Sequence, residues 1–374
     1  MVGIDTVLIK VASRCNINCS YCYVYNMGDA GWAVMPKRIS HETALAIGRA
    51  LSELSSAQRH PFAVVLHGGE PLLLGQKRLE RLLEILRRAL PPSHSISIQT
   101  NGMLITEAIL DTCSEYRTNL SVSIDGPGIV HDRYRVGHGG EPTHAKVVEG
   151  IRRLREHRDA QFLYSGLLAV IDPDSHPVDV YQYLKGLGAP SIDFLCRDGN
   201  HSHLPDGKAS FESIEFGSWL ARLLDLYLAD PTPPRIRLFD DIIRLILGAS
   251  GIKEGVGITD FGILILETDG SVAKNDTLKS AYDGADRFET TWSVHEHNLT
   301  EVVNSIEFAS YHAMQRPSSK ACLSCPELHV CGGGMPLHRW SDENGFNNPS
   351  VYCMDQKFLI DHIRSRLFEY RISA

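Results

Sequence analysis

Three cysteines stand close together near the start of the sequence, at Cys15, Cys19 and Cys22, directly after the apolar run 7–11. Thiolates are the usual ligands of iron–sulfur clusters, and a four-iron cube is usually held by four of them. Three thiolates therefore leave one iron open to a small molecule, so this stretch is expected to be a reaction site. Three ordinary buried thiols or a zinc knuckle that lacks a ligand are the alternatives.

A second group of cysteines lies near the end of the sequence: Cys322, Cys325, Cys331 and Cys353. Four thiolates complete a four-iron cube, so this cluster would have no open iron and would pass on electrons instead of binding substrate. Zinc also accepts four thiolates and is the main competitor. The remaining cysteines, Cys113 and Cys196, are expected to be buried core thiols.

The bulk composition is that of an ordinary soluble protein. The 374 residues carry a formal net charge of −8, which gives no electrostatic reason to expect nucleic acid or an anionic membrane as a partner. No apolar run approaches the ~20 residues that span a bilayer, and residues 1–5 do not resemble the start of a signal peptide. We therefore expect a cytoplasmic protein whose clustered thiols are metal ligands and not disulfides.

Short apolar runs alternate with helical patterns in the first half, as in βα units around a parallel sheet. Strands are expected at 7–11, 62–67, 95–100, 119–124, 162–170 and 191–195. Helices are expected at 41–58, with Ser40 as the N-cap, and at 77–89, 106–116, 143–157 and 178–187. Six such units predict an α/β fold with a partial (β/α)6 barrel. Active sites of parallel α/β folds collect beyond the carboxyl ends of the strands.

The proline-rich stretch 230–234 breaks this pattern, and a domain boundary is placed there. The predicted domains are the barrel at 1–230, a bridging helix and hairpin region at 231–310, and a loop-rich iron–sulfur domain at 311–374. Asp269-Gly270 between two apolar runs predicts the hairpin, and a final helix is expected at 354–369. The loop-rich part has too few periodic apolar residues to hold together alone, so it needs a metal.

Three of the expected strands end in residues suited to binding a ligand. These are Gly68, Gly69 and Glu70 after the second strand, Asn101 after the third, and Ser123 and Asp125 at the end of the fourth. Paired glycines let the backbone approach a ligand closely, and the polar side chains can satisfy ribose hydroxyls and a carboxylate. Each motif taken alone is also an ordinary turn former.

The order of these motifs resembles the radical SAM (S-adenosylmethionine) peptide and protein maturases that carry a C-terminal SPASM-type cluster domain. The order is Cys-x3-Cys-x2-Cys, Gly-Gly-Glu-Pro, Gln-Thr-Asn-Gly, Ser-x-Asp-Gly-Pro and His-Asp-x-Tyr-Arg, and the match covers nearly the whole sequence. The resemblance implies a TIM-like partial barrel, SAM on the open iron, and a 4Fe–4S cluster at each cysteine group. It also implies SAM contacts from Tyr21, Gly69, Ser123 and Arg135, the alternative for Arg135 being a solvated surface side chain.

Full SPASM proteins have a first auxiliary cluster whose cysteines are missing here. The stretch 248–262 contains no cysteine, and Asn275 and Met335 stand where two of the others would be. Two 4Fe–4S clusters in total are therefore expected. Asp276 stands where related maturases carry an aspartate proposed as a proton acceptor. It is either a general base or a hairpin-end residue bonded to nearby backbone.

The resemblance implies an enzyme that makes a 5'-deoxyadenosyl radical and removes hydrogen from a peptide. The segment 275–284 looks like that of maturases that crosslink aromatic side chains in ribosomally made precursor peptides to form cyclophanes, which is the expected reaction. Formylglycine formation from Cys or Ser in a sulfatase is the alternative, and a non-catalytic iron–sulfur sensor or electron carrier is the alternative of another class. The expected partners are the precursor peptide and an electron donor such as a ferredoxin or flavodoxin, with leader binding by the barrel surface or by a separate protein.

Overall fold

The computed structural model describes residues 3–251, 254–258 and 260–373, and the chain forms two compact units. The first unit contains Met1–Ile124, His131–Leu167 and Phe261–His312, and the second contains Asp125–Val130, Leu168–Asp260 and Ala313–Ala374. In the described part of the chain, no helix is long and apolar enough to cross a membrane. The domain limits expected near residues 230 and 310 remain a prediction.

The first unit is built on a largely parallel sheet. Its strands are β1 (Thr6–Ala12), β3 (Ala63–Gly68), β4 (Ile96–Thr100), β5 (Thr118–Ser123), the start of β7 (Tyr164–Val170), β9 (Ile263–Leu266) and β10 (Val272–Ala273). Their order in the sheet is β10-β9-β1-β3-β4-β5-β7. The pairs β1–β3, β3–β4 and β4–β5 are parallel, which confirms the sheet expected from the βα pattern.

The hairpin expected around Gly270 is confirmed, but its first strand has a second partner. The strand β10 runs antiparallel to β9, and β9 also pairs in parallel with β1, from Thr6 opposite Ile263 to Ile9 opposite Leu266. All four residues of β9 are buried. Such a continuous apolar run is typical of a strand inside a parallel sheet, so β9 extends the sheet beside β1.

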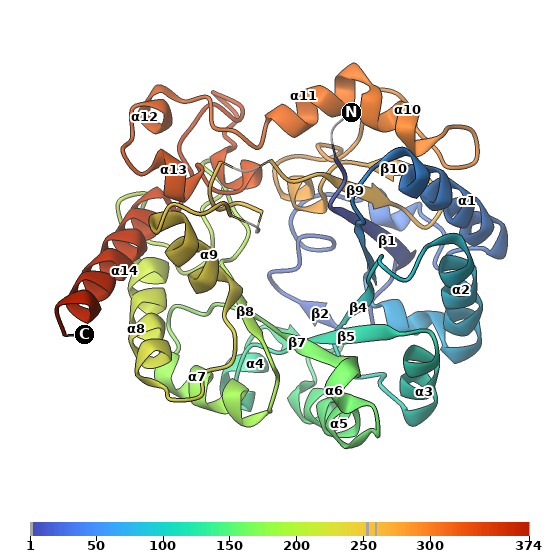
Figure 1. Cartoon of the computed structure of the whole chain (residues 1–374), viewed down its shortest axis with the longest axis horizontal. Helices are drawn as coiled ribbons and strands as arrows, with labels where there is room; N and C mark the ends of the chain where they lie inside the picture. The colour runs from blue at the N-terminus through green and yellow to red at the C-terminus, as the bar shows by residue number, and fades with distance from the viewer. Residues whose placement is uncertain (1–2, 252–253, 259, 374) are drawn as a thin grey trace. The chain divides into compact units, whose positions relative to one another are not determined.

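Helices cover the outer face of this sheet, as Figure 1 shows for α1, α2 and α3. The helices are α1 (His41–Ala57), α2 (Gln76–Ala89), α3 (Glu107–Glu115) and α5 (His144–Glu156), with the shorter α10 (Leu299–Asn304) and α11 (Ile306–Ala313). The expected N-cap of α1 is confirmed, because the Ser40 side chain accepts a hydrogen bond from Thr43 N–H at 2.9 Å. Ile47, Leu51 and Leu54 form its buried face.

Side chains in β3, β4 and β5 alternate between buried and half-buried positions. The buried set packs under the helices, and the half-buried set lies on the opposite face of the sheet. This second set includes His67, Gln99 and Ser123, and the Gln99 amide donates to the Ser123 hydroxyl at 2.9 Å. The sheet therefore carries polar side chains on the face that its helices leave uncovered.

The second unit is mainly helical and contains the end of β7 and its neighbour β8 (Ile192–Leu195). Its helices are α7 (Pro177–Gly186), α8 (Glu215–Ala229), α9 (Arg237–Ile246), the short α12 (Lys320–Leu323) and α13 (Leu328–Cys331), and α14 (Cys353–Ser373). The helices α8 and α14 pack closely at Gly217, where an added Cβ would lie 2.7 Å from the Asp355 backbone. Asp355 also accepts hydrogen bonds from Gly217 N–H and Lys208 Nζ, each at 2.7 Å.

The two isolated cysteines differ in burial. Cys113 on α3 is fully buried, as expected. Cys196 is only half-buried, so its assignment as a core thiol is wrong. The reason is its position one residue after β8, where the chain leaves the sheet.

Candidate cluster and cofactor sites

The loop after β1 forms a tight turn that carries all three cysteines of the first group. Cys22 N–H donates to the Cys19 carbonyl at 3.0 Å, and the Asn26 amide donates to the same carbonyl at 2.7 Å. Burial raises the pKa of Cys15 to about 12, so this thiol stays protonated unless a cation such as iron binds it. Three thiols in one turn fit a cluster with three protein ligands, and this ligand set remains a prediction.

Gly68 and Gly69, at the end of β3, lie directly against the start of the cysteine loop. An added Cβ on Gly68 would lie 2.1 Å from the Ala12 carbonyl oxygen. An added Cβ on Gly69 would lie 1.9 Å from the Tyr25 hydroxyl and 2.3 Å from the Arg14 carbonyl oxygen. Both glycines are therefore required by the close approach of two backbone segments, whether or not they also contact SAM.

Glu70 is fully buried and joins the ends of two neighbouring strands. Its carboxylate accepts hydrogen bonds from the Thr100 hydroxyl at 2.7 Å, from Asn101 N–H at 2.8 Å and from Leu72 N–H at 2.9 Å. These bonds fix the residues after β3 against those after β4. The structure thus gives Glu70 a positioning role, and its contact with SAM remains a prediction.

The polar residues at the next strand ends have different surroundings. The Asn101 amide donates to the Asn16 side chain at 2.8 Å and lies 3.8 Å from the Cys15 sulfur, beside the cysteine loop. Ser123 lies on the half-buried face of β5. Asp125 belongs to the second unit, where it accepts a hydrogen bond from Val170 N–H at 3.1 Å.

Arg135 is buried, with 7% of its surface exposed, so the alternative of a solvated surface side chain is wrong. The short strands β2 (Asn18–Cys19) and β6 (Arg135–Val136) pair antiparallel, which places Arg135 opposite Cys19. The Arg135 guanidinium donates to the Tyr21 hydroxyl at 3.0 Å. A buried guanidinium beside the cysteine loop is suited to bind a carboxylate as a planar fork, and SAM carries one.

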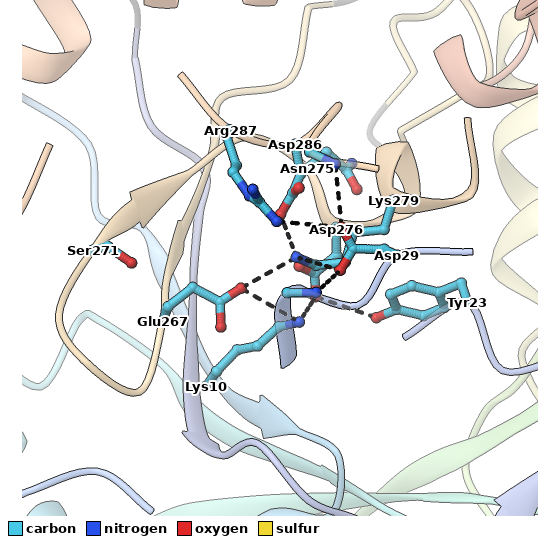
Figure 2. A network of polar contacts seen from close by, with 12 residues as sticks. Lys10, Tyr23, Asp29, Glu267, Ser271, Asn275, Asp276, Lys279, Asp286 and Arg287 are labelled. Atoms are coloured by element: carbon cyan, nitrogen blue, oxygen red, sulfur yellow. Dashed lines mark hydrogen bonds and ion pairs between the residues drawn. The ribbon is translucent and has the colours of Figure 1, made fainter. Parts of the chain in front are cut away.

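Asp276 begins the 3-10 helix η3 (Asp276–Ser280), and its carboxylate is buried in an ionic network (Figure 2). Lys10 Nζ lies 2.6 Å from one carboxylate oxygen of Asp276, and the Tyr23 hydroxyl lies 3.3 Å from the same oxygen. Burial alone would raise the pKa of Asp276, but the ammonium groups of Lys10 and Lys279 outweigh it and hold this pKa below its ordinary value. Asp276 is therefore an ionised, ion-paired carboxylate.

Lys10 is the first of several residues of this network that the sequence analysis missed; the others include Glu267, Lys279 and Asp286. Lys10 lies within β1 and is 3% exposed. An ionisable side chain inside an otherwise apolar strand needs a buried partner of opposite charge. The presence of a lysine in this apolar strand could therefore have predicted a buried carboxylate beside it, and Asp276 is that carboxylate.

The four cysteines of the second group line one cavity of the second unit. These are Cys322, Cys325, Cys331 and Cys353. Cys325 N–H donates to the Cys322 carbonyl at 3.0 Å, which closes the turn between the first two thiols. Burial raises the pKa of Cys331 to about 12, so it too requires a metal to stay ionised. Four thiols around one cavity fit a fully ligated cluster, and this ligand set also remains a prediction.

The two positions that lack cysteine have other structural roles. The Asn275 side chain caps η3 by accepting a hydrogen bond from Thr277 N–H at 3.0 Å. The Met335 sulfur would lie 2.7 Å from a Cβ added on Gly255, so the thioether packs closely on that backbone. Among residues 248–251, 254–258 and 260–262, the sequence offers no thiol for a further cluster.

Comparison with known proteins identifies relatives over nearly the whole chain. Residues 9–184 match the radical SAM superfamily. A cysteine-type anaerobic sulfatase-maturating enzyme of Clostridium perfringens (strain 13 / Type A) is 25% identical over 375 residues, which covers 97% of each protein. A serine-type anaerobic sulfatase-maturating enzyme of Bacteroides thetaiotaomicron is 26% identical over 369 residues, which covers 90% of this chain and 83% of the relative.

Solved structures share the fold. Native anSMEcpe with bound AdoMet and the Cp18Cys peptide has a TM-score of 0.83 and 21% identity, and covers 98% of this chain and 99% of its own. Streptococcus suis SuiB bound to its precursor peptide SuiA has a TM-score of 0.62 and 12% identity, and covers 89% of this chain and 72% of its own. These likenesses confirm the expected α/β fold with a parallel sheet and a SPASM-like C-terminal domain.

Proposed function

We propose that this chain, a radical SAM enzyme whose residues 9–184 match the family domain, oxidises a side chain in a peptide or protein substrate. The observation that carries this proposal is the turn with Cys15, Cys19 and Cys22, which is one thiol short of a complete ligand set. Its cofactors are SAM and 4Fe–4S clusters. The radical SAM domain favours an enzyme over a non-catalytic iron–sulfur sensor or electron carrier.

When bound, these cofactors supply a 5'-deoxyadenosyl radical that removes a hydrogen atom from carbon, and an acceptor for the second electron of the oxidation. Cys15, Cys19 and Cys22 would hold the first cluster. Arg135 and Tyr21 stand beside them to bind and orient the carboxylate of SAM, since Arg135 is buried and donates to Tyr21. The second-unit cysteines would hold the auxiliary cluster.

The relatives favour formylglycine formation over the cyclophane crosslink that segment 275–284 suggested. Both Clostridium and Bacteroides relatives are sulfatase-maturating enzymes, and they align over most of the chain. We therefore propose oxidation of a Cys or Ser side chain in a sulfatase-like segment as the first reaction to test. Two electrons and two protons leave the side chain, and for Cys water then replaces the sulfur, which leaves as hydrogen sulfide.

A crosslink in a precursor peptide remains the second candidate, because one observation separates this chain from a full SPASM protein. Asn275 and Met335 occupy the positions expected for two cysteines of the first auxiliary cluster, and each has a structural role of its own. Formation of one crosslink also removes two electrons and two protons, so a single auxiliary cluster is compatible with it. For this candidate, a separate leader-recognition protein is a possible further partner.

The test uses anaerobically reconstituted protein with SAM, and dithionite in place of the proposed ferredoxin or flavodoxin. We expect 5'-deoxyadenosine, and a peptide that has lost two hydrogens or, for Cys, has also exchanged sulfur for oxygen. A hydrazide probe reacts with formylglycine and not with a crosslink, so it separates the two candidates. Wild-type protein that gives no 5'-deoxyadenosine, or the same amount as Cys15→Ala, would refute the proposed function.

A further inference from the structure

Five buried ionisable side chains form a row that alternates between carboxylate and ammonium (Figure 2). The row is Asp276, Lys10, Glu267, Lys279 and Asp286, and each residue is at most 7% exposed. Lys10 Nζ lies 2.6 Å from Asp276 and 3.8 Å from Glu267, and Lys279 Nζ lies 3.6 Å from Glu267. Lys279 also forms an ion pair with Asp286. The contacts at the two ends, Lys10 with Asp276 and Lys279 with Asp286, are within hydrogen-bond distance, and the two contacts of Glu267 are ion pairs slightly longer than a hydrogen bond.

The row exists because distant parts of the chain meet at β1. Lys10 lies in β1, and Glu267 follows β9, the strand that pairs with β1 in parallel. The 3-10 helix η3 supplies both Asp276 and Lys279. The network is thus a direct result of the extra strand beside β1.

The row opens on a cavity of about 240 Å³. Lys10, Glu267, Lys279 and Asp286 all line this cavity, and Asp276 does not. The cavity wall also includes Arg287, whose side chain is 55% exposed. Among the described residues, the second carboxylate oxygen of Asp286 has no hydrogen-bond partner although it is buried. Water in the cavity is the natural partner for such an oxygen.

The network has one more carboxylate than it has ammonium groups, so it can bind one additional proton. Three carboxylates face two ammonium groups, so the row carries one excess negative charge. Asp29 and Arg287 stand beside it 3.8 Å apart and add one charge of each sign, which leaves the excess unchanged. Because a buried net charge is costly, uptake of one proton stabilises the row. No metal is needed, although oxygens of the three carboxylates lie within 4.8 Å of one another.

We propose that this row is a proton relay that takes the proton released during substrate oxidation at Asp276 and delivers it to water in the cavity beside Asp286. This inference rests on the proposed function. The Asp276 carboxylate accepts the substrate proton, Lys10 passes one of its own protons to Glu267, and Asp276 then returns a proton to Lys10. Lys279 moves the proton from Glu267 to Asp286 by the same exchange. Only O–H and N–H bonds form and break, and no electron moves.

The pKa directions of Asp276 and Glu267 agree with the first part of this transfer. Burial lowers the pKa of Lys10 and Lys279, but the neighbouring carboxylates outweigh it and raise both, so each ammonium group gives up a proton only in exchange for another. Burial raises the pKa of Glu267, and the nearby carboxylates of Asp276 and Asp286 add to the effect, against the opposing ammonium groups. The pKa of Asp276 lies below its ordinary value, so a proton that reaches Asp276 moves on to Glu267. His67 faces Asp276 from β3, and burial lowers its pKa to about 4, so it stays neutral and does not compete. Besides Lys10, Lys279 and His67, the Tyr23 hydroxyl also faces Asp276.

The test compares Lys10→Arg and Glu267→Gln with the wild type. Arginine keeps the charge and the ion pair of Lys10 but does not release a proton, and glutamine keeps the shape of Glu267 without accepting one. Glu149→Gln makes the same chemical change on the exposed side of α5 and serves as the matched control. In both relay variants we expect the product formed per 5'-deoxyadenosine to fall about a hundredfold. The control should match the wild type.

Two further measurements separate a relay from a structural ion-pair network. In the wild type, product formation should decline as the pH falls through the raised pKa of Glu267, and this limb should be absent from Glu267→Gln. At a pH below this limb, infrared spectra of the reconstituted protein without substrate should show a protonated carboxyl band that shifts in heavy water and is missing from Glu267→Gln. Wild-type product yields in both relay variants, or a band that persists in Glu267→Gln, would overturn the relay. A wild type that makes neither 5'-deoxyadenosine nor product would instead refute the proposed function, and the infrared band would still test the network.

Discussion

The buried ion pair between Lys208 and Asp355 allows the sharpest prediction about the stability of the second unit. The two side chains are 0% and 3% exposed, and Lys208 Nζ lies 2.7 Å from one carboxylate oxygen of Asp355. The other oxygen accepts a hydrogen bond from Gly217 N–H. This N–H lies in the first turn of α8, where amides have no acceptor within the helix, so Asp355 also caps that helix. We expect Lys208→Met to leave a buried carboxylate without its counter-ion.

The expected loss in the free energy of unfolding depends on which buried groups are left without a partner. Removing one member of a buried ion pair costs about 3–5 kcal/mol, and replacing both members with apolar residues is often nearly neutral. In the double variant Lys208→Met/Asp355→Leu, the Gly217 N–H loses its acceptor, at a cost of about 1–3 kcal/mol. The double variant should therefore be more stable than Lys208→Met alone.

Urea unfolding monitored by circular dichroism measures these differences in the free energy of unfolding. Burial raises the pKa of Asp355 in the folded protein, against the opposing effects of Lys208 and Gly217 N–H. The folded state therefore binds this proton more tightly than the unfolded state, and stability rises as the pH falls. The deficit of Lys208→Met should shrink as the pH is lowered towards the raised pKa of Asp355, where the buried carboxylate takes up a proton. A loss under about 1 kcal/mol, or a double variant less stable than the single one, would refute the reasoning.

Three other changes have clear expected outcomes. Cys15→Ala should lower the iron content by about half and abolish 5'-deoxyadenosine, whereas Cys353→Ala should lower the iron content to the same extent and still produce it, as iron assay and chromatography would show. Gly69→Ala should prevent folding of the first unit, because its Cβ would lie 2.3 Å from the backbone carbonyl oxygen of Arg14. In Gly186→Ala the added Cβ has nothing within 4 Å, so this variant should melt like the wild type. Because the pKa of His67 is lowered to about 4 from 6.5, the wild type should lose stability as the pH falls between these values, and thermal melts of His67→Gln should show a weaker loss.

The sequence predicted the elements well because their signals are local. The capping serine of α1 and the Asp-Gly turn of the hairpin act within a few residues, and both are confirmed. The burial of Arg135 could not be predicted in this way, because it depends on the pairing of β2 with β6 across more than a hundred residues. Lys10 was missed for a related reason: its partner Asp276 is remote in sequence, and only the pairing of β1 with β9 brings their elements together.

The position of β9 also constrains how the chain is made. The strand β1 is synthesised at the start of translation, whereas β9 begins only at Ile263. One edge of β1 therefore has no partner strand during most of synthesis. An exposed strand edge next to a row of apolar side chains invites pairing with other nascent chains. A chaperone that shields strand edges during synthesis should therefore raise the yield of soluble protein.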